Sequence, residues 1–565
     1  MLMMSVAMAM VMTIASTQQR EQQDLKVELK AETEAEIAEG KADEKEKRVW
    51  RRRAEEIREA TRSAYRAYME HGEGLDDLDP VKKRGVASDI HARATLFDSL
   101  STLWVTGLRD EFSEAVVLIR REGGGSTGVL HSGKTFEYHI RVVGGLLSAY
   151  ALSGEGVLLQ AATEAADGVL GALSLSRTSI PVPHARMLPL GRQPIRWAVG
   201  RAIDEARFRL DPDGMLCNSL AGVGSLGLEL RWLSRETGDP CYREAAEKIA
   251  AAVESEWRRS RERGGVWVKR VWATAEAGYH GNERGCGGGV TARLGTGGDS
   301  YYEYLLKEHL LFPEDPDAAR RFRDMYPLLA KRAHAEFFDP RGYSHFACFS
   351  PGMLALGSRL LPDAPLQMQR AEQMLEYCLQ RYNGTLTGLA PDDARDAAFP
   401  LRPETVESLF VLWRTTGRPV YRQAAWRIWK AVRRHCRVAD SGGFSGLLNV
   451  HEVPSGWDGV QPSYFISEML KYLYLTFDDD SQAPLLPLSD FVFTTEGHPL
   501  PIASPRCPAP GCTPRPWLWA LWDGWLLEWL FLLSLPYFLF KLSRCCCRCW
   551  GHCCFCRHRR NQQAN

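Results

Sequence analysis

The chain has 565 residues, of which 45% are hydrophobic and 17 are tryptophan, so it is long and apolar enough to bury a large core. Its 70 basic and 70 acidic residues give a formal net charge of +0. This balance excludes the strong positive field of a nucleic-acid-binding protein, and we expect no nucleic-acid partner.

The first 60 residues differ in composition from the rest. Residues 1–16 form a short apolar run that ends in small residues, which is typical of a signal peptide. No basic flank precedes the run, so a signal anchor is equally open. Residues 17–60 are rich in Glu, Lys, Arg and Gln and predict a charged stalk, either helical or disordered. The folded domain is expected to cover residues 61–503.

Three segments of this domain repeat one pattern. A glycine that ends one helix (Gly154, Gly238 and Gly417) is followed by apolar residues close to positions i, i+3, i+4 and i+7. These glycines lie 84 and 179 residues apart (238 − 154 and 417 − 238), the second gap being roughly twice the first. The repeat predicts an all-α toroid of paired helices around a central cavity, with short apolar runs forming small β-hairpins at its rim.

Candidate site residues appear first at Glu137. This carboxylate lies four residues before Arg141, so the two can pair on one helix face, either as a plain ion pair or as an acid held by a cation. Further on, Gly297-Gly298-Asp299 opens another helix, where Ser300 and Glu303 are expected to form a capping box. Asp299 would then stand at the helix entrance, as a sugar-binding carboxylate would.

The run Leu401 to Ser408 predicts a helix start with Glu404 in the first turn, beside Arg402. The positive end of the helix dipole favours the ionised carboxylate, and Glu407 projects from the same face. A general base facing a sugar, or a cation site, requires such a pair. An ordinary charged helix start is the alternative.

Three further positions complete the candidate set. His345 has aromatic neighbours and could equally be a hydrogen-bonded core histidine. Glu468 begins a helical run in which a surface charge is the alternative. The segment Phe493 to Pro499 places the hydroxyl of Thr495 beside Glu496 in a predicted loop, and such oxygen ligands suit a hard cation such as Ca²⁺.

The C-terminal region predicts a membrane anchor. A Pro-rich linker (504–523) precedes an apolar segment (524–542), and a Cys- and Arg-rich tail follows (543–565). The positive-inside rule would place the tail in the cytosol and the large domain in the lumen. A hydrophobic hairpin lying on a surface is the alternative to a span. The tail cysteines suggest S-palmitoylation, with a zinc site using His552 as the competing interpretation.

From about Tyr65 to Pro501 the chain resembles the class I α-1,2-mannosidases, glycoside hydrolase family 47. Six blocks match that family's motifs in order: Asp98-Ser99-Leu100, Phe136 to Leu147, Gly298 to Lys307, Leu401 to Leu409, Glu468 to Tyr474, and Thr495 to Pro499. The resemblance implies an (α/α)7 barrel, in agreement with the helix repeat. It also implies calcium-dependent, inverting hydrolysis of terminal α-1,2-linked mannose from high-mannose N-glycans of glycoproteins. A membrane-bound enzyme of the endoplasmic reticulum or Golgi, with a lumenal catalytic domain, is then expected.

The same resemblance implies roles for particular residues. Glu137 would be the acid, through a water, and Glu404 the base, with Asp299 as the third catalytic carboxylate and the assignment among the three left open. Thr495 would bind Ca²⁺ through its hydroxyl and carbonyl. The residues expected to contact the glycan or the waters of the calcium ion are Arg141, His345, Glu407, Glu468 and Glu496. Cys348 and Cys378 occupy the positions of the family's disulfide.

The chain departs from the family pattern at five positions. Ser101 and Gly222 stand where Asp and Glu are usual, and Asp392 where Glu is usual; Thr494 and Gly497 replace Asn and Ala. None of these changes removes a catalytic carboxylate. Two other functions stay open: an ER-degradation-enhancing mannosidase-like protein that marks misfolded glycoproteins, and a non-catalytic lectin for high-mannose glycans.

Overall fold

The computed structural model describes residues 45–121, 131–174, 180–181, 184–187, 216–262, 271–273, 297–338, 342–478 and 484–503. The predicted leader, linker, membrane segment and tail all lie outside these residues. Within the described part of the chain, no helix combines the length and the apolar character that crossing a membrane requires.

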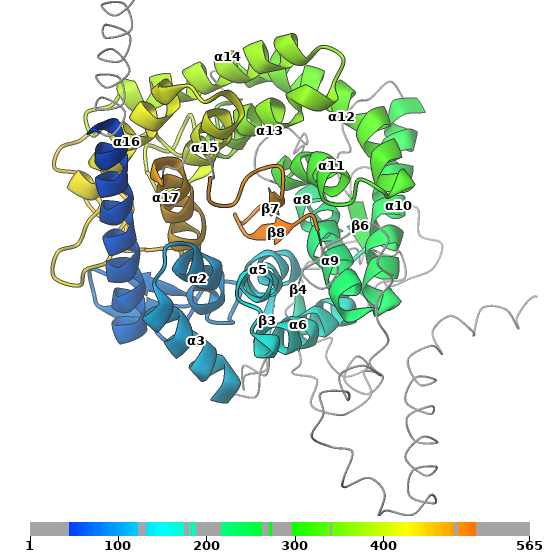
Figure 1. Ribbon diagram of the computed structural model, residues 1–565, viewed down its shortest axis with the longest axis horizontal. Coiled ribbons are helices and arrows are strands. Elements are labelled where there is room, and N and C mark those ends of the chain that lie inside the picture. The colour runs from blue at the N-terminus through cyan, green and yellow to red at the C-terminus, as the bar shows by residue number, and fades with distance from the viewer. Residues whose placement is uncertain are drawn as a thin grey trace, which may run out of the picture. The chain divides into compact units, whose positions relative to one another are not determined.

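Paired helices form a closed ring (Figure 1). The inner helices are α2 (Ala94–Val105), α5 (Gly144–Ser153), α9 (Gly227–Thr237), α11 (Asp299–Leu311), α13 (Ser350–Gly357), α15 (Glu404–Thr416) and α17 (Lys471–Phe477). Their outer partners, in the same order, are α3 (Arg109–Arg121), α6 (Gly156–Ser174), α10 (Pro240–Glu262), α12 (Pro316–Phe337), α14 (Ala364–Asn383), α16 (Pro419–His435) and a helix over residues 45–71. The ring closes where α2 packs on the helical segment that leads into α17. The predicted all-α (α/α)7 barrel is confirmed.

The three predicted glycine stops are also confirmed. Gly154, Gly238 and Gly417 end α5, α9 and α15 with φ values of 76°, 73° and 68°. This left-handed conformation costs other residues about 1 kcal/mol, which is why glycine suits these turns. Each glycine turns the chain from an inner helix to its outer partner, so the sequence repeat and the helix pairs coincide.

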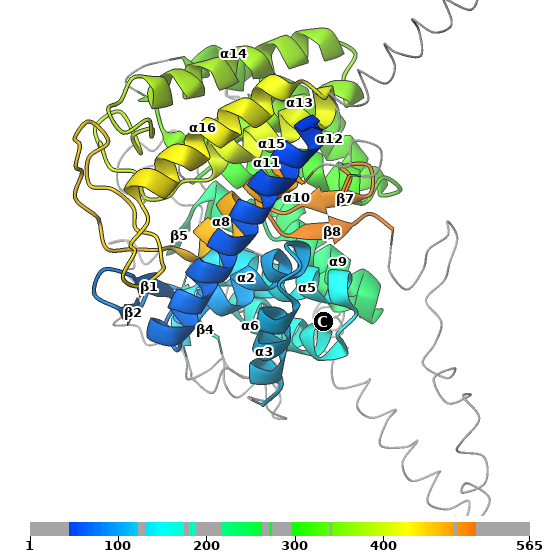
Figure 2. The same ribbon diagram turned by 60° about the vertical axis from the view of Figure 1, so that its left-hand side comes forward.

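The helix over residues 45–71 lies on the outside of the ring beside α16, as Figure 2 shows. Trp50, Ala54 and Ile57 are buried, and their spacing of four and three residues places them on one face. The side chain of Glu56 accepts a hydrogen bond from Trp429 Nε1 at 2.7 Å. Part of the segment that composition assigned to a charged stalk therefore packs on the barrel, because its few apolar residues share that face.

Strands in the described residues form four two-stranded antiparallel hairpins. Their pairs are β1 (Asp77–Asp79) with β2 (Arg84–Val86), β3 (His131–Lys134) with β4 (His184–Met187), β5 (Leu216–Asn218) with β6 (Val271–Ala273), and β7 (Phe491–Phe493) with β8 (Pro499–Pro501). The last hairpin lies inside the ring (Figure 1), where β7 contacts α11 and β8 contacts α5. Its loop, residues 494–498, thus reaches the ends of the inner helices.

Candidate active site

The predicted site residues come from separate inner-ring elements. Asp299 and Glu404 are the first residues of α11 and α15, and Glu137 lies in the short α4 (Thr135–Tyr138) that leads toward α5. Thr495 lies in the loop between β7 and β8. Long stretches of chain separate these elements, and only the closed ring brings them to one interior.

Two of the residues lie on widened helical turns. Arg141 is in a π-helical segment, η1 (His139–Val143), and Glu468 is in a second one, η5 (Phe465–Leu470). Such turns are rare and cluster at functional sites, because the extra residue re-aims the side chains of one turn. Both segments feed directly into inner helices, α5 and α17.

Asp299 connects the three predicted catalytic carboxyls electrostatically. It is partly exposed to the interior but lies deep among protein atoms, and this burial raises its pKa to about 7. The backbone N–H of Ser300 lowers that pKa, whereas the negative charges of Glu303, Glu404 and Glu137 raise it further. Because a Coulomb interaction weakens with distance, these contributions link Asp299 electrostatically to both glutamates.

Glu404 is held as a carboxylate by His345. Burial alone would raise the pKa of Glu404, but the hydrogen bond and charge of His345, together with Arg402, lower it below its usual value. The distance from His345 Nδ1 to Glu404 Oε2 is 2.7 Å, and the other ring nitrogen lies 2.8 Å from the hydroxyl of Tyr382. The predicted place of Glu404 in the first helical turn is confirmed, with Pro403 as the N-cap.

His345 itself is fully buried. The resemblance placed it in the lining of the sugar pocket, whereas the structure places it behind Glu404, within the core. His345 is therefore a hydrogen-bonded core histidine, as one interpretation of the sequence proposed, and it also orients a candidate catalytic group.

The predicted pair of Glu137 and Arg141 is confirmed. Nε and Nη2 of Arg141 lie 3.3 and 3.2 Å from one oxygen of Glu137. Nη1 of the same guanidinium donates to Ser463 at 2.8 Å, lies 3.3 Å from Asp98 and also pairs with Glu496. Because one rigid guanidinium serves all these groups, Arg141 ties Glu137 to the loop that carries Thr495.

Glu407, Glu468 and Glu496 form a buried acidic cluster around this centre. Burial raises the pKa of each well above its usual value, and neighbouring carboxylates raise it further. Such crowding is unfavourable unless protons or a cation offset the charge. A bound divalent cation would do so, and it would lower all three pKa values at once.

Thr495 suits the role of cation ligand in this cluster. It is partly exposed, whereas the other residues of its loop are buried. Its N–H lies 3.5 Å from the hydroxyl of Tyr304, and no described residue hydrogen-bonds to its own hydroxyl or carbonyl. Among the described residues, no group of three or more His, Cys, Asp or Glu side chains is arranged to hold a metal directly. The hydroxyl and carbonyl oxygens of Thr495 are the type of ligand that suits a hard cation such as Ca²⁺.

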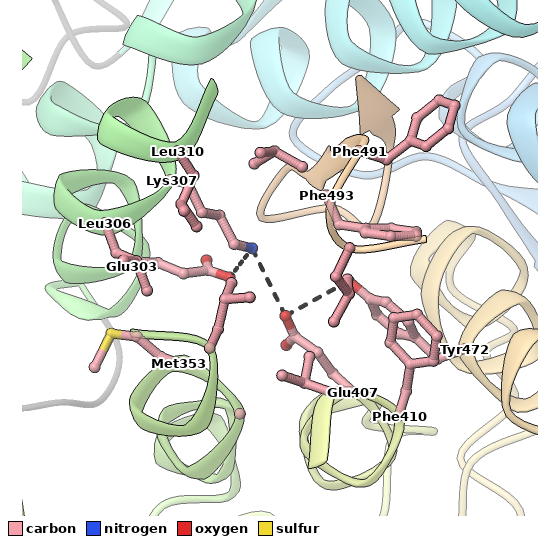
Figure 3. Close-up of a pocket in the computed structure, with 15 residues that line it drawn as sticks. Glu303, Leu306, Lys307, Leu310, Met353, Glu407, Phe410, Tyr472, Phe491 and Phe493 are labelled. Carbon is pink, nitrogen blue, oxygen red and sulfur yellow. Dashed lines mark hydrogen bonds and ion pairs between the residues drawn. The ribbon is translucent and has the colours of Figure 1, made fainter. Parts of the chain in front are cut away.

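A cavity next to the acidic cluster has a polar end and an apolar end (Figure 3). At the polar end, Lys307 Nζ pairs with Glu303 and lies 3.7 Å from Glu407, which is 3.5 Å from the hydroxyl of Tyr472. Leucines and aromatic residues of α11 and β7 line the rest. The lysine thus brings a positive charge from α11 to Glu303 and Glu407.

The predicted capping box at α11 is wrong. The N-cap is Gly298, without a side-chain cap, and the hydroxyl of Ser300 bonds that of Ser225 at 2.8 Å. Glu303 pairs with Lys307 instead of reaching back to the helix start. Ser300 thus has a tertiary partner, and Glu303 pairs with a lysine one turn further along the same helix, so neither side chain caps the helix start.

The departures from the family pattern have structural counterparts. Ser101 Oγ lies 3.1 Å from His498 Nδ1, so this position keeps a polar partner. At Gly222 an added Cβ would lie 2.4 Å from Asn218 Oδ1, so the side chain of Asn218 would have to move to admit a larger residue. Asp392 accepts a hydrogen bond from Arg402 Nε at 2.7 Å.

Cys348 and Cys378 form a disulfide, with their Cα atoms 6.1 Å apart. The bond joins the segment that carries His345 to α14, which supplies Tyr382. Both residues that orient Glu404 therefore lie beside one covalent link.

Several supporting residues have no role assigned from the sequence. They are Asp98 and Ser463 beside Arg141, Tyr382 behind His345, and the buried lysines Lys307 and Lys471. A signal existed for Lys471, because it is a lone cation in the apolar run Met469 to Leu473. A charge in such a run needs a buried partner or a function.

Comparisons with known proteins agree with this geometry. The family model described as "Glycosyl hydrolase family 47" matches residues 60–502. "Mannosyl-oligosaccharide alpha-1,2-mannosidase IA" of Spodoptera frugiperda is 30% identical over 498 residues, covering 79% of this chain and 67% of that protein. The human "Endoplasmic reticulum mannosyl-oligosaccharide 1,2-alpha-mannosidase" is 33% identical over 486 residues, covering 78% of this chain and 63% of its own length.

Among solved structures, the "alpha-1,2-mannosidase from Trichoderma reesei" superposes with a TM-score of 0.65 at 24% identity. The match covers 80% of this chain and 99% of that chain. At this level of identity the likeness supports the barrel fold.

Proposed function

The chain belongs to glycosyl hydrolase family 47 and is a glycoside hydrolase, and from this premise we propose that it removes terminal α-1,2-linked mannose from high-mannose N-glycans, with inversion and with bound Ca²⁺. The observation that carries the proposal is the state of Glu404. His345 holds it ionised although it is buried, and Asp299, whose pKa is about 7, lies close by. Together they would supply a base and a proton-bearing carboxyl.

In the proposed reaction, Glu404 removes a proton from a water that attacks the anomeric carbon. The bond from that carbon to the bridging oxygen breaks, and the oxygen receives a proton that originates from Glu137, through a water. Inverting enzymes place the two carboxyls about 6.5–9.5 Å apart to admit the nucleophilic water. Arg141 fixes Glu137 in place, and Asp299 exchanges protons with the pair, so the assignment among the three carboxyls is itself part of the proposal.

The proposed cation site consists of the hydroxyl and carbonyl of Thr495, with Glu407, Glu468 and Glu496 holding its waters or the glycan. When bound, Ca²⁺ would supply a fixed positive charge that binds sugar hydroxyls and orients the ring. The crowding of buried carboxylates around Thr495 supports this part of the proposal. Thr495→Val, which keeps the shape and removes the hydroxyl, tests it directly.

We further propose that the enzyme acts in the endoplasmic reticulum or Golgi, with the barrel in the lumen and an anchor at residues 1–16 or 524–542. The name of the human relative, an endoplasmic reticulum enzyme, supports this location. The disulfide supports it too, because such bonds persist in oxidising compartments.

The test is to incubate the full-length protein with a nine-mannose glycan and excess Ca²⁺ and to measure free mannose. We expect release that EDTA abolishes and that Glu404→Gln lowers by about 10²- to 10⁴-fold, the usual contribution of a general base. Glu404→Gln should still bind the glycan, because its shape is unchanged. Retention of glycan without any mannose release by the wild type would contradict the proposal and favour a lectin.

A further inference from the structure

Two buried lysines meet the loop of Thr495 from opposite sides. Lys471, at the start of α17, is fully buried, and its Nζ lies 2.7 Å from the carbonyl oxygen of Gly497. Lys307, in α11, is 5% exposed, and its Nζ lies 3.3 Å from the carbonyl oxygen of Thr494. The two carbonyls that receive these ammonium groups flank Thr495 and Glu496.

The loop between them is a tight turn. Gly497 N–H donates to the carbonyl of Thr494 at 3.1 Å, and Gly497 has φ +71°. Its Cα lies so close to η5 that an added Cβ would be 3.2 Å from Glu468 Cγ and from the carbonyl oxygen of Ser467. The turn is therefore packed against the segment that carries Glu468, and small shifts of its backbone would move Thr495 relative to the acidic cluster.

A carbonyl that accepts a hydrogen bond from a lysine is less available to a cation. The carbonyl oxygens of Thr494 and Gly497 each accept a hydrogen bond from a lysine. The hydroxyl and carbonyl of Thr495, which lies between these two residues in the chain, therefore remain available to the cation. Desolvating an ammonium group is costly, and Lys471 donates to Gly497 alone in the described part of the chain. Because burying this ammonium group is costly, its hydrogen bond to the carbonyl of Gly497 indicates a role in holding the turn in addition to packing.

We propose that Lys307 and Lys471 are positioning residues for the divalent cation, which hold the 494–497 turn so that Thr495 presents its two oxygens to the ion. The inference rests on the proposed function, since it assumes the cation at Thr495. Neither lysine touches the ion. Lys471 acts through the carbonyl of Gly497, whereas Lys307 acts through the carbonyl of Thr494 and also lies 3.7 Å from Glu407.

The two effects of each lysine on cation binding have opposite signs, and this makes the proposal testable. A positive charge near the site repels a cation, so removing it should tighten binding if charge were all that mattered. Removing a group that orients a ligand weakens binding, by about 10- to 100-fold for such supporting partners. The direction of the change therefore separates positioning from charge.

The experiment measures Ca²⁺ binding to the full-length protein by calorimetry, alone and without glycan, for the wild type, Lys471→Met and Lys307→Met. The matched control is Arg231→Met, which removes another buried cation, paired with Asp315 and not with the turn. We expect Lys471→Met to weaken Ca²⁺ binding by at least tenfold and Lys307→Met to weaken it too, with Arg231→Met unchanged in Ca²⁺ affinity although less heat-stable.

Unchanged or tighter binding by both lysine variants would overturn the proposal. If Lys471→Met does not fold, Lys307→Met and the milder Lys471→Arg replace it. Weaker Ca²⁺ binding by these variants supports the proposal, and unchanged or tighter binding contradicts it. If the wild type binds no Ca²⁺, the proposed cation site itself is contradicted. If the wild type and both lysine variants bind Ca²⁺ equally well, only the role of the lysines is contradicted.

Discussion

Nδ1 of His345 lies 2.7 Å from Oε2 of Glu404, and the hydroxyl of Tyr382 lies 2.8 Å from Nε2 of the same ring. Both ring nitrogens thus have a partner, and Nδ1 is the one that faces the carboxylate. This chain of three residues fixes the protonation and direction of Glu404, because a buried carboxylate with a donor stays ionised at lower pH. The orientation of the proposed base is thus set from behind, in the core.

The first prediction concerns this chain. In His345→Ala the pKa of Glu404 should rise, because burial raises this pKa and the variant lacks the hydrogen bond from His345, which is the largest effect that lowers it. The acidic limb of the kcat/KM profile for mannose release should therefore move to higher pH. Tyr382→Phe, which removes one hydroxyl and keeps the ring, should shift the same limb less. An unchanged limb in His345→Ala would contradict the assignment of Glu404 as the ionised base.

The second prediction concerns the stability of the cation-free protein. The pKa of Asp299 is about 7 in the folded state against 3.8 ordinarily, so the folded state binds the extra proton. Its contribution to stability is complete below pH 4 and is lost as pH rises through 7, a loss of at most about 4 kcal/mol before solvent screening. Asp299→Asn in EDTA should therefore lose less thermal stability than the wild type between pH 5 and 8. Parallel Tm curves for the two proteins would show that Asp299 is not the group responsible.

The third prediction concerns the disulfide. Cys348 and Cys378 are separated by 30 residues in sequence, and closing a loop of this size contributes about 3–4 kcal/mol in the chain-entropy model. The double variant Cys348→Ala, Cys378→Ala should lose free energy of unfolding of this order in denaturant titrations. Val117→Ala, at an exposed side chain of α3, is the control and should change little. Equal stability of the double variant and the control would rule out a structural role for the bond.

The fourth prediction concerns the ion pair between Arg402 and Asp392. Arg402 donates to Asp392 at 2.7 Å, and its guanidinium lies 3.9 Å from the centre of the Phe346 ring. Both charged side chains keep some exposure, at 16% and 20%. Asp392→Asn should raise KM for a branched glycan several-fold with a smaller change in kcat, because Arg402 loses its anchor while Glu404 keeps His345. A fall in kcat alone would place Asp392 in the chemistry instead.

Local sequence patterns predicted much of this protein. The spacing of apolar residues and the glycines Gly154, Gly238 and Gly417 predicted the helix pairs, since both follow from the 3.6-residue period and from the left-handed turn. The pairing of Glu137 with Arg141 and the place of Glu404 in a first turn follow from the same short-range geometry. Each of these features depends on residues a few positions apart, so the sequence by itself determined them.

Only the closed ring decided which of these groups meet. Asp299, Glu404 and Thr495 belong to α11, α15 and the β7–β8 loop, and no local rule relates them. The ring also placed His345 in the core, paired Ser300 with Ser225 against the predicted cap, and brought Lys307 and Lys471 to one turn. Contacts between distant segments depend on how whole helices pack, and burial, which shifts the pKa values of the acids, exists only after that packing.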